Sequence, residues 1–369
     1  MSIFILFFHV RRLIDRQVPL CRDGSAAVDL LKSFLTVSNL VVLVGFSAVP
    51  ALAEATKYPL TIENCGSQVT FQQAPERAVG LGQNSAEIML LLGLEDKMVG
   101  TAFWPNKVLP QVAEANAKVK VLTVEFPTFE SILAQNPDFV AAALPSLLGP
   151  SSKVAKREDF EKVGIPTYIS PSTCVAEGEK HDKFGYGDRS QLWNMDTLFK
   201  EIEDIAQIFD VTDKGQAVIS DLKKREAALR ADAPEKGKGL SYVFWFSSPS
   251  PSADAYVGGK NSASGFIADI LGGTNAISNE AESPAIGWES IIASNPDVIV
   301  VTQVDRNRWE LDKAEEKIKF LNNDPATSQM KAVKNKALVI MPAQAMNPSV
   351  QTIYGAEQVA QQLKALGLK

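Results

Sequence analysis

The sequence predicts an α/β protein of two lobes, in which central, mainly parallel sheets are joined by a single long, rigid helix. The chain has 369 residues, 46% of them hydrophobic and 22% charged, which suits two domains with sizeable cores. Short apolar runs alternate with amphipathic stretches, as in parallel α/β layers. A mostly helical stretch, Asp196–Asp232, separates two such alternating regions.

The first alternating region follows Tyr58. Helices are expected at Ser85–Leu92, which Gly93 ends, and at Thr128–Gln135. Strands are expected at Leu60–Ile62, Gln68–Phe71, Ala78–Leu81, Met98–Thr101, Phe139–Ala142 and Thr167–Ile169.

The same rhythm returns after Gly239. Here the expected elements are a helix at Gly265–Leu271 and strands at Ser241–Phe246, Val298–Thr302 and Ala337–Met341.

The helical stretch between the two regions breaks near Val211, where Thr212 is expected to cap a second helix that runs to Asp232. At 1.5 Å per residue that helix would span about 30 Å, which makes it a stiff connector. The alternative, a helix packed on one large domain, stays open. The predicted division is therefore 54–195 for the first lobe, 196–234 for the connector and 235–369 for the second lobe.

The amino-terminal residues 1–53 are expected to be an extension plus a cleaved signal peptide. Lys32 precedes an apolar run that ends in Ala51-Leu52-Ala53, so cleavage is predicted after Ala53 and the protein is expected in the periplasm. The apolar run is short for a bilayer span. Residues 1–27 precede an otherwise complete signal, and translation starting near Val28 would explain them.

Charge and cysteine content fit an exported protein. The net charge of −6, without a Lys/Arg block, argues against a nucleic-acid partner. Cys65 and Cys174 remain after cleavage, and an oxidising compartment favours a disulfide between them. Closing a loop of about 110 residues is worth up to ~4–5 kcal/mol in the chain-entropy model. Two separate buried thiols are the alternative.

Two segments 159 residues apart are nearly the same. Phe129–Val140 and Trp288–Ile299 share seven of twelve positions, and each has a Glu near its start and an Asn-Pro-Asp turn before an apolar strand. Proline ends the helix and fixes the turn. Such a repeat indicates that the two halves share a supersecondary unit.

With these repeats, the chain resembles the periplasmic solute-binding proteins of siderophore and cobalamin ABC importers. Pro75-Glu76-Arg77 and Ile270–Asn275 fit the same family, and the resemblance covers nearly the whole chain after residue 53. It implies two α/β lobes joined by a long helix that limits closure, with a ligand held between them. It also implies an ABC permease and its ATPase as partners. Glu130 and Glu289 would then contact arginines of the permease. The alternative is a purely structural role, in which each glutamate stabilises the helix dipole from the first turn of its helix.

Ligand contacts are expected from loops that follow strands. These loops include Gln83-Asn84, Trp104-Pro105, Leu144–Ser146, His181–Trp193, Trp245–Ser248, Tyr256–Ser264 and Asp305–Trp309. Arginines beside aromatic residues suit a large, flat or anionic ligand such as a ferric siderophore. The candidate ligand-binding residues are Trp104, Tyr186, Arg189, Trp245, Arg306, Arg308 and Trp309. For each aromatic, a place in the core is the alternative.

Other function classes have weaker support. Only His181 remains after cleavage, so the sequence predicts no multi-histidine metal site and no resident cofactor. No G-x-S-x-G motif accompanies that histidine, and an enzyme is not expected. The loop Gly258–Gly265 lacks P-loop spacing. Cobalamin or haem as the ligand, or a ligand-sensing module, remain alternatives. We expect a monomer.

Overall fold

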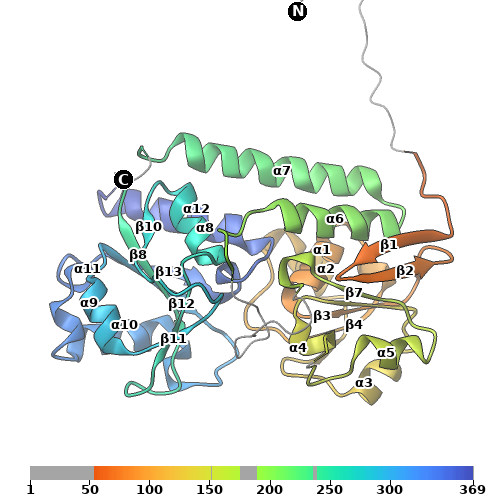
Figure 1. The fold of residues 1–369 in the computed structure, drawn as a ribbon, viewed down its shortest axis with the longest axis horizontal. Helices are drawn as coiled ribbons and strands as arrows, with labels where there is room; N and C mark the ends of the chain where they lie inside the picture. The colour runs from red at the N-terminus through yellow and green to blue at the C-terminus, as the bar shows by residue number, and fades with distance from the viewer. Residues whose placement is uncertain (1–53, 151, 175–188, 236–238, 369) are drawn as a thin grey trace, which may run out of the picture. The chain divides into compact units, whose positions relative to one another are not determined.

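A computed structural model of the chain describes residues 54–150, 152–174, 189–235 and 239–368 (Figure 1). The chain divides into residues 1–51 and a compact unit, 52–369, which contains both predicted lobes. The predicted signal peptide and its cleavage site, together with Tyr186 and His181, lie outside the described residues.

The first lobe contains a five-stranded parallel sheet with the strand order β5-β4-β3-β6-β7 and a separate antiparallel hairpin, β1-β2. The central strands β3 and β6 are buried throughout, as expected for a sheet covered on both faces. The strands are β1 (Leu60–Asn64), β2 (Ser67–Phe71), β3 (Ala78–Leu81), β4 (Met98–Ala102), β5 (Val121–Thr123), β6 (Phe139–Ala142) and β7 (Thr167–Ile169). The helices are α1 (Gln83–Leu91), α2 (Ala113–Asn116), α3 (Phe129–Leu133), α4 (Pro145–Leu148) and α5 (Arg157–Glu161), with 3₁₀ helices η1 (Glu95–Lys97), η2 (Pro110–Val112) and η3 (Pro171–Thr173).

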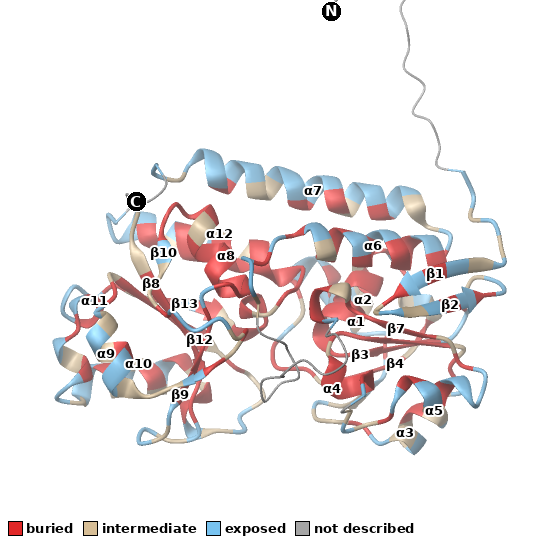
Figure 2. Cartoon of the chain, in the orientation of Figure 1, coloured by how far each residue is buried: buried red, intermediate tan, exposed pale blue. Residues whose placement is uncertain are grey.

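Two helices, α6 (Asp196–Ile208) and α7 (Thr212–Ala231), form the connector (Figure 1). The residue that caps α7 is Val211, and Thr212 is the first helical residue, so the predicted cap is wrong by one position. A Cβ on Gly215 would lie 2.6 Å from Ala206 Cβ, which shows how closely α7 approaches α6. Along α7, the buried residues Gly215, Ile219, Leu222 and Leu229 form one inward stripe while the outer face is exposed (Figure 2).

The second lobe is built on a sheet with the order β11-β9-β8-β12-β13, with β10 paired to β8. The pairs β8-β12 and β12-β13 are parallel, but β9 is antiparallel to both β8 and β11. Its strands are β8 (Ser241–Ser247), β9 (Ala255–Val257), β10 (Thr274–Asn275), β11 (Ala285–Ile286), β12 (Val298–Gln303) and β13 (Leu338–Pro342). Its helices are α8 (Ala263–Ile270), α9 (Trp288–Ser294), α10 (Ala314–Asn323), α11 (Lys331–Lys334) and α12 (Gln351–Ala365), with 3₁₀ helices η4 (Glu310–Asp312), η5 (Thr327–Gln329) and η6 (Ala343–Met346).

The predicted two-lobe α/β class is confirmed, and the strands that were expected lie within about two residues of those found. Strands β5, β9, β10 and β11 were not predicted. These strands have two or three residues each, so their sequences are too short to show an alternating pattern.

The repeat has the same structure in both lobes. Asn136 and Asn295 both adopt positive φ, at 49° and 39°, the left-handed conformation that asparagine tolerates; Asn295 caps α9, while Asn136 follows the cap of α3, Ala134, by two residues. After the proline, the carboxylate of Asp138 accepts hydrogen bonds from the backbone N–H groups of Glu76 and Arg77, both at 2.8 Å. Asp297 likewise accepts from the N–H and the hydroxyl of Ser241, both at 2.8 Å. Each turn therefore fastens the start of a neighbouring central strand.

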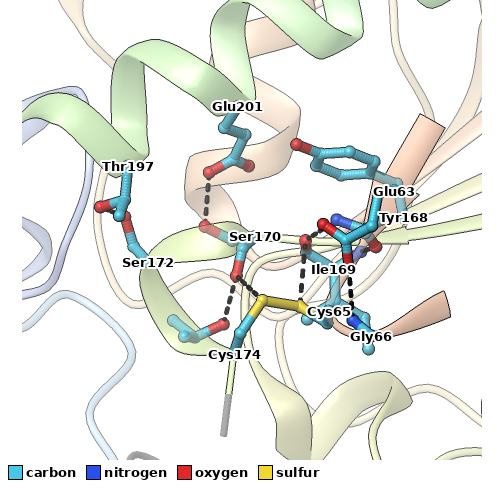
Figure 3. The surroundings of a disulfide bond; sticks show 12 residues. Glu63, Cys65, Gly66, Tyr168, Ile169, Ser170, Ser172, Cys174, Thr197 and Glu201 are labelled. Carbon is cyan, nitrogen blue, oxygen red and sulfur yellow. Dashed lines mark hydrogen bonds between the residues drawn. A yellow bond between two sulfur atoms is a disulfide. The ribbon is translucent and has the colours of Figure 1, made fainter.

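The Cys65–Cys174 disulfide is present, with Cα atoms 5.3 Å apart (Figure 3). Cys65 lies in the turn of the β1-β2 hairpin, and Cys174 follows η3. The neighbouring Asn64 also exchanges two 2.8 Å hydrogen bonds with the backbone of Ile169 in β7. The bridge thus fixes the hairpin against the edge strand of the first sheet.

Candidate ligand-binding site

A cavity opens between the two lobes, with about 620 Å³ of empty space that is partly open to solvent. Much of that space is open solvent: the volume that a water-sized sphere can occupy is about 50 Å³, well below the ~300–1,000 Å³ of typical small-molecule sites. Both lobes contribute to the wall. The lining residues are Gly82, Gln83, Asn84, Phe103, Pro105, Ala143 and Leu144 from the first lobe, and Phe246, Ser283, Arg306, Gln344, Asn347 and Pro348 from the second.

Sheet topology explains the position of this cavity. Most lining residues directly follow the parallel strands β3, β4, β6, β12 and β13, so the carboxyl edges of both sheets border the same space. Gly82 lies at the first of these edges with φ at 90°, and a Cβ there would be 2.7 Å from Ala143 Cβ. Glycine is therefore required for the close passage of the loops after β3 and β6.

Arg306 is the one positively charged residue among the described lining residues. Its side chain is only 7% exposed, and its guanidinium lies 5.3 Å from the centroid of the Phe103 ring across the cleft. Nε and Nη1 are buried, and neither makes a hydrogen bond. Burial lowers the pKa of this guanidinium and nearby Asp312 opposes that shift, but arginine remains charged. Buried donors without acceptors are rare in proteins, and a water molecule or a ligand atom at this position would satisfy them.

Glu125, which follows β5 in the first lobe, reaches two arginines of the second lobe. Its Oε1 lies 3.5 Å from Arg306 Nε, an ion pair without a hydrogen bond, while its Oε2 accepts a hydrogen bond from Arg308 Nη2. Glu125 and Arg308 remain 39% and 37% exposed. The ion pair therefore crosses the cleft at a point where solvent can enter.

The loop that carries Arg306 is held from below by buried Asp312. This carboxylate accepts hydrogen bonds from the backbone N–H of Arg308 at 2.6 Å and of Trp309 at 2.9 Å, and from the Ser247 hydroxyl at 2.6 Å. Lys317 Nζ donates to the Thr302 carbonyl at 2.6 Å at the end of β12. Burial lowers the pKa of Lys317 to about 7, opposed by Asp312. A fixed loop keeps the arginine pointed into the cavity.

Hydrogen bonds also join the lobes at the base of the cleft. Asn106 donates to the Gln303 carbonyl at 2.6 Å, and its own side-chain oxygen accepts from the Gln344 N–H at 2.9 Å. Gln351 Nε2 donates to Glu87 Oε1 at 2.7 Å. Burial raises the pKa of Glu87 to about 7, although hydrogen bonds from Gln351, Leu109 and Gln83 act to lower it.

Two of the predicted ligand contacts lie in the hydrophobic core instead. Trp104 is 7% exposed and donates from Nε1 to the Thr101 hydroxyl at 3.2 Å. Trp245 is 1% exposed and packs edge-on against Trp288 and Phe320 on the other face of its sheet. Neither lines the cavity. Large aromatic rings stabilise cores by their apolar area, and we assign both residues to that role.

Three more of the predicted residues make contacts with other residues of this chain. Arg189 forms an ion pair with buried Glu282 and donates to the Ser172 carbonyl at 2.8 Å. Trp309 stacks on Tyr256, with ring centroids 5.2 Å apart. Arg308 contacts Glu125 at the cleft, and Tyr186 lies outside the described residues. Of the six candidates that the structure describes, Arg306 is the one that lines the cavity.

Several site residues were missed. Phe103, Gln344 and Asn347 line the cavity, and Gln344 and Asn347 come directly after a strand that the sequence predicts. The rule that ligands bind where parallel strands end would have found all three, because Phe103 directly follows β4, which the sequence also predicts. Nothing in the local sequence identifies Glu125, because its partners are 181 and 183 residues away.

The described residues contain no group of three or more His, Cys, Asp or Glu side chains that could hold a metal ion. Within the same residues, no helix has both the length and the apolar character needed to cross a bilayer.

The chain is similar to known proteins over most of its length. It is 23% identical over 250 residues to the uncharacterized ABC transporter substrate-binding lipoprotein YvrC of Bacillus subtilis. The matched region covers 66% of this chain and 69% of the relative. The fold matches a periplasmic binding protein of Veillonella parvula with a TM-score of 0.65, at 23% identity and with 83% and 97% of the two chains covered.

Two further structures share the fold. One is an ABC-type Fe³⁺-hydroxamate transport system protein of Saccharomonospora viridis, with a TM-score of 0.65, 24% identity and 83% and 99% coverage. The other is the periplasmic haem-binding protein HutB of Vibrio cholerae, with a TM-score of 0.58, 20% identity and 78% and 98% coverage. The family model described as periplasmic binding protein matches residues 79–345. With two lobes, a cavity between them and this match over most of its length, the chain belongs to the periplasmic binding protein family.

Proposed function

We propose that this chain is the substrate-binding component of an ABC importer and that it captures a ferric siderophore-like chelate between its lobes. It would act outside the cytoplasm and deliver the chelate to a permease that an ATPase drives. The iron is cargo and arrives already held by its chelator, since the described residues offer no metal-binding cluster.

The observation that carries this proposal is Arg306 in the inter-lobe cavity. A buried guanidinium with two donors unused needs an acceptor, and an oxygen-rich chelate supplies acceptors. The ring of Phe103 beside it offers a flat apolar surface for the organic part of the chelate. One structure with this fold comes from a Fe³⁺-hydroxamate transport system, which agrees with an iron chelate, while others with this fold are haem-binding proteins.

Isothermal titration calorimetry of the purified protein tests the proposal with ferric hydroxamate, catecholate and citrate chelates, and with cobalamin and haem. We expect one ferric chelate class to bind with a Kd in the micromolar range or below. Arg306→Met should then weaken binding by about 10- to 100-fold, because a charge-assisted contact is worth about 1.5–3 kcal/mol.

Arg230→Met serves as the matched control, because Arg230 pairs with Glu226 and Asp269 and does not line the cavity. Its affinity should equal that of the wild type. Binding of haem or cobalamin in preference to every ferric chelate would replace the siderophore proposal, and no binding by any of these ligands would remove it.

Glu130 and Glu289 are proposed as the contacts with the permease. Both are exposed in the first turn of the repeated helices α3 and α9, one in each lobe. Within the described part of the chain neither forms an ion pair. Two equivalent carboxylates on the two lobes suit a partner that touches both lobes at once.

A further inference from the structure

Glu125 places a carboxylate of the first lobe at the arginine side chains of the second. The two arginines contact Glu125 differently. Partly exposed Arg308 donates a hydrogen bond to the carboxylate of Glu125. Buried Arg306 receives only the more distant oxygen, 3.5 Å from Nε, and no hydrogen bond. Glu125 therefore occupies the approach to Arg306 without satisfying it.

A ligand oxyanion that accepted a hydrogen bond from Nε of Arg306 would compete with that Glu125 oxygen, which lies 3.5 Å from the same nitrogen. Two anionic oxygens so close together repel each other, so both cannot keep their positions. Displacing Glu125 costs little, because an ion pair that is more than a third exposed contributes little net stability. The incoming anion gains more, because it supplies the acceptors that Arg306 lacks.

We propose that Glu125 is a specificity-determining residue: it shields Arg306 in the ligand-free protein and yields that position only to a chelate with an anionic oxygen. This inference rests on the proposed function and narrows its ligand to anionic ferric chelates, such as carboxylate or catecholate complexes. A neutral chelate, such as a trihydroxamate whose three anionic groups balance the charge of Fe³⁺, cannot compete for the arginines in this way.

The binding test compares wild type, Glu125→Gln and the control Glu114→Gln by calorimetry with ferric citrate, a ferric tris-catecholate and neutral ferrichrome. Glu114 is exposed in α2 and does not line the cavity. We expect Glu125→Gln to bind the anionic chelates about 3- to 10-fold more tightly, since it removes an internal competitor of modest strength. Ferrichrome affinity and all Glu114→Gln affinities should not change.

Two binding outcomes would overturn the inference. If Glu125→Gln lowered the affinity for every chelate equally, Glu125 would hold the closed lobes together over the ligand instead of competing with the ligand. Unchanged affinity for the anionic chelates would show that it does not shield Arg306.

A ligand-free measurement keeps this inference separate from the proposed function. The ¹H–¹⁵N signals of arginine Nε–H groups are recorded for wild type and Glu125→Gln, with Arg306→Lys and Arg308→Lys to assign them. We expect Glu125→Gln to shift both signals and titration of the wild type with free citrate to shift the Arg306 signal. If no ferric chelate binds to the wild type, the proposed function fails, but these chemical shifts still test the role of Glu125. Arginine signals that do not move in Glu125→Gln, or an Arg306 signal that does not respond to citrate, would overturn the inference.

Discussion

At the scale of single residues, the base of the cleft contains a carboxyl group that is costly to ionise. Glu87 is fully buried, and its Oε1 accepts hydrogen bonds from Gln351, Leu109 and Gln83 while its Oε2 has no partner. Burial raises its pKa from 4.5 to about 7. Gln351 belongs to the second lobe, so the protonation state of Glu87 bears on a contact between the lobes.

Stability should therefore fall as pH rises from about 5 to 8. In this window folded Glu87 retains a proton that the unfolded chain has already lost, so raising the pH favours the unfolded state. Glu87→Gln keeps an accepting oxygen but cannot titrate. In this variant the free energy of unfolding should fall by on the order of 2 kcal/mol less between pH 5 and pH 8 than in the wild type. Urea unfolding at pH 5 and pH 8 measures it, with Glu114→Gln as control. An identical pH dependence in wild type and Glu87→Gln would contradict the assignment.

At the scale of elements, the Asn-Pro-Asp turn is the unit that the two lobes share. In both copies a left-handed asparagine precedes the proline, and the aspartate after it accepts hydrogen bonds where a central strand begins, from two N–H groups at Asp138 and from the N–H and hydroxyl of Ser241 at Asp297. The same local sequence gives the same turn twice, because proline and asparagine fix the backbone, while the strands that the aspartates reach lie 56–62 residues away.

Asp138→Ala should destabilise the protein by about 1–2 kcal/mol, because two exposed hydrogen bonds, from the N–H groups of Glu76 and Arg77 to a charged acceptor, are lost. Asp138→Asn should lose roughly half as much, since one amide oxygen can still accept. The shift in the urea midpoint checks both. Asp96→Ala, at an exposed position of η1, should stay within about 0.5 kcal/mol of wild type. A loss in Asp138→Ala no larger than in Asp96→Ala would contradict the role of the turn.

At the scale of the whole described unit, α7 contacts both lobes. It packs on α6 through Gly215, and its arginines reach the second lobe, where Arg225 pairs with Glu357 of α12 and Arg230 with Asp269 of α8. A continuous helix fastened at both ends resists bending, so we expect lobe movements to be small. Residues 52–369 form one compact unit in which two separate sheets lie below the two halves of α7 (Figure 1), so the division into 54–195, 196–234 and 235–369 stays a prediction.

Transport should depend on both repeat glutamates, while ligand affinity should not. Glu130→Ala combined with Glu289→Ala removes one exposed carboxylate from each lobe, and neither residue lines the cavity. We expect uptake of the ligand by cells to fall at least about tenfold, as for loss of charged interface contacts, with an unchanged Kd in calorimetry.

Glu114→Ala combined with Glu315→Ala is the matched control, because these are also first-turn glutamates, exposed, and one in each lobe. The control separates a docking role from the general effect of a helix dipole. Normal uptake by the Glu130/Glu289 double variant would exclude the docking role.

The sequence by itself determined the two-lobe α/β class, the repeated turn and most strands of the sheets, and it favoured the Cys65–Cys174 pairing that the structure contains. These features come from periodicity, proline and cysteine, which act locally or through residue type. It also placed Arg306 in a loop after a strand, where the topology of parallel sheets directs ligand contacts.

Only the tertiary structure decided which side chains reach the cavity. Trp104 and Trp245 have the same residue type and local setting as a ligand-stacking aromatic, yet their side chains point into the core. Glu125 meets Arg306 and Arg308 because two loops about 180 residues apart border one cleft. Side-chain direction and contacts between distant loops depend on how complete lobes pack, and no local pattern in the sequence carries that information.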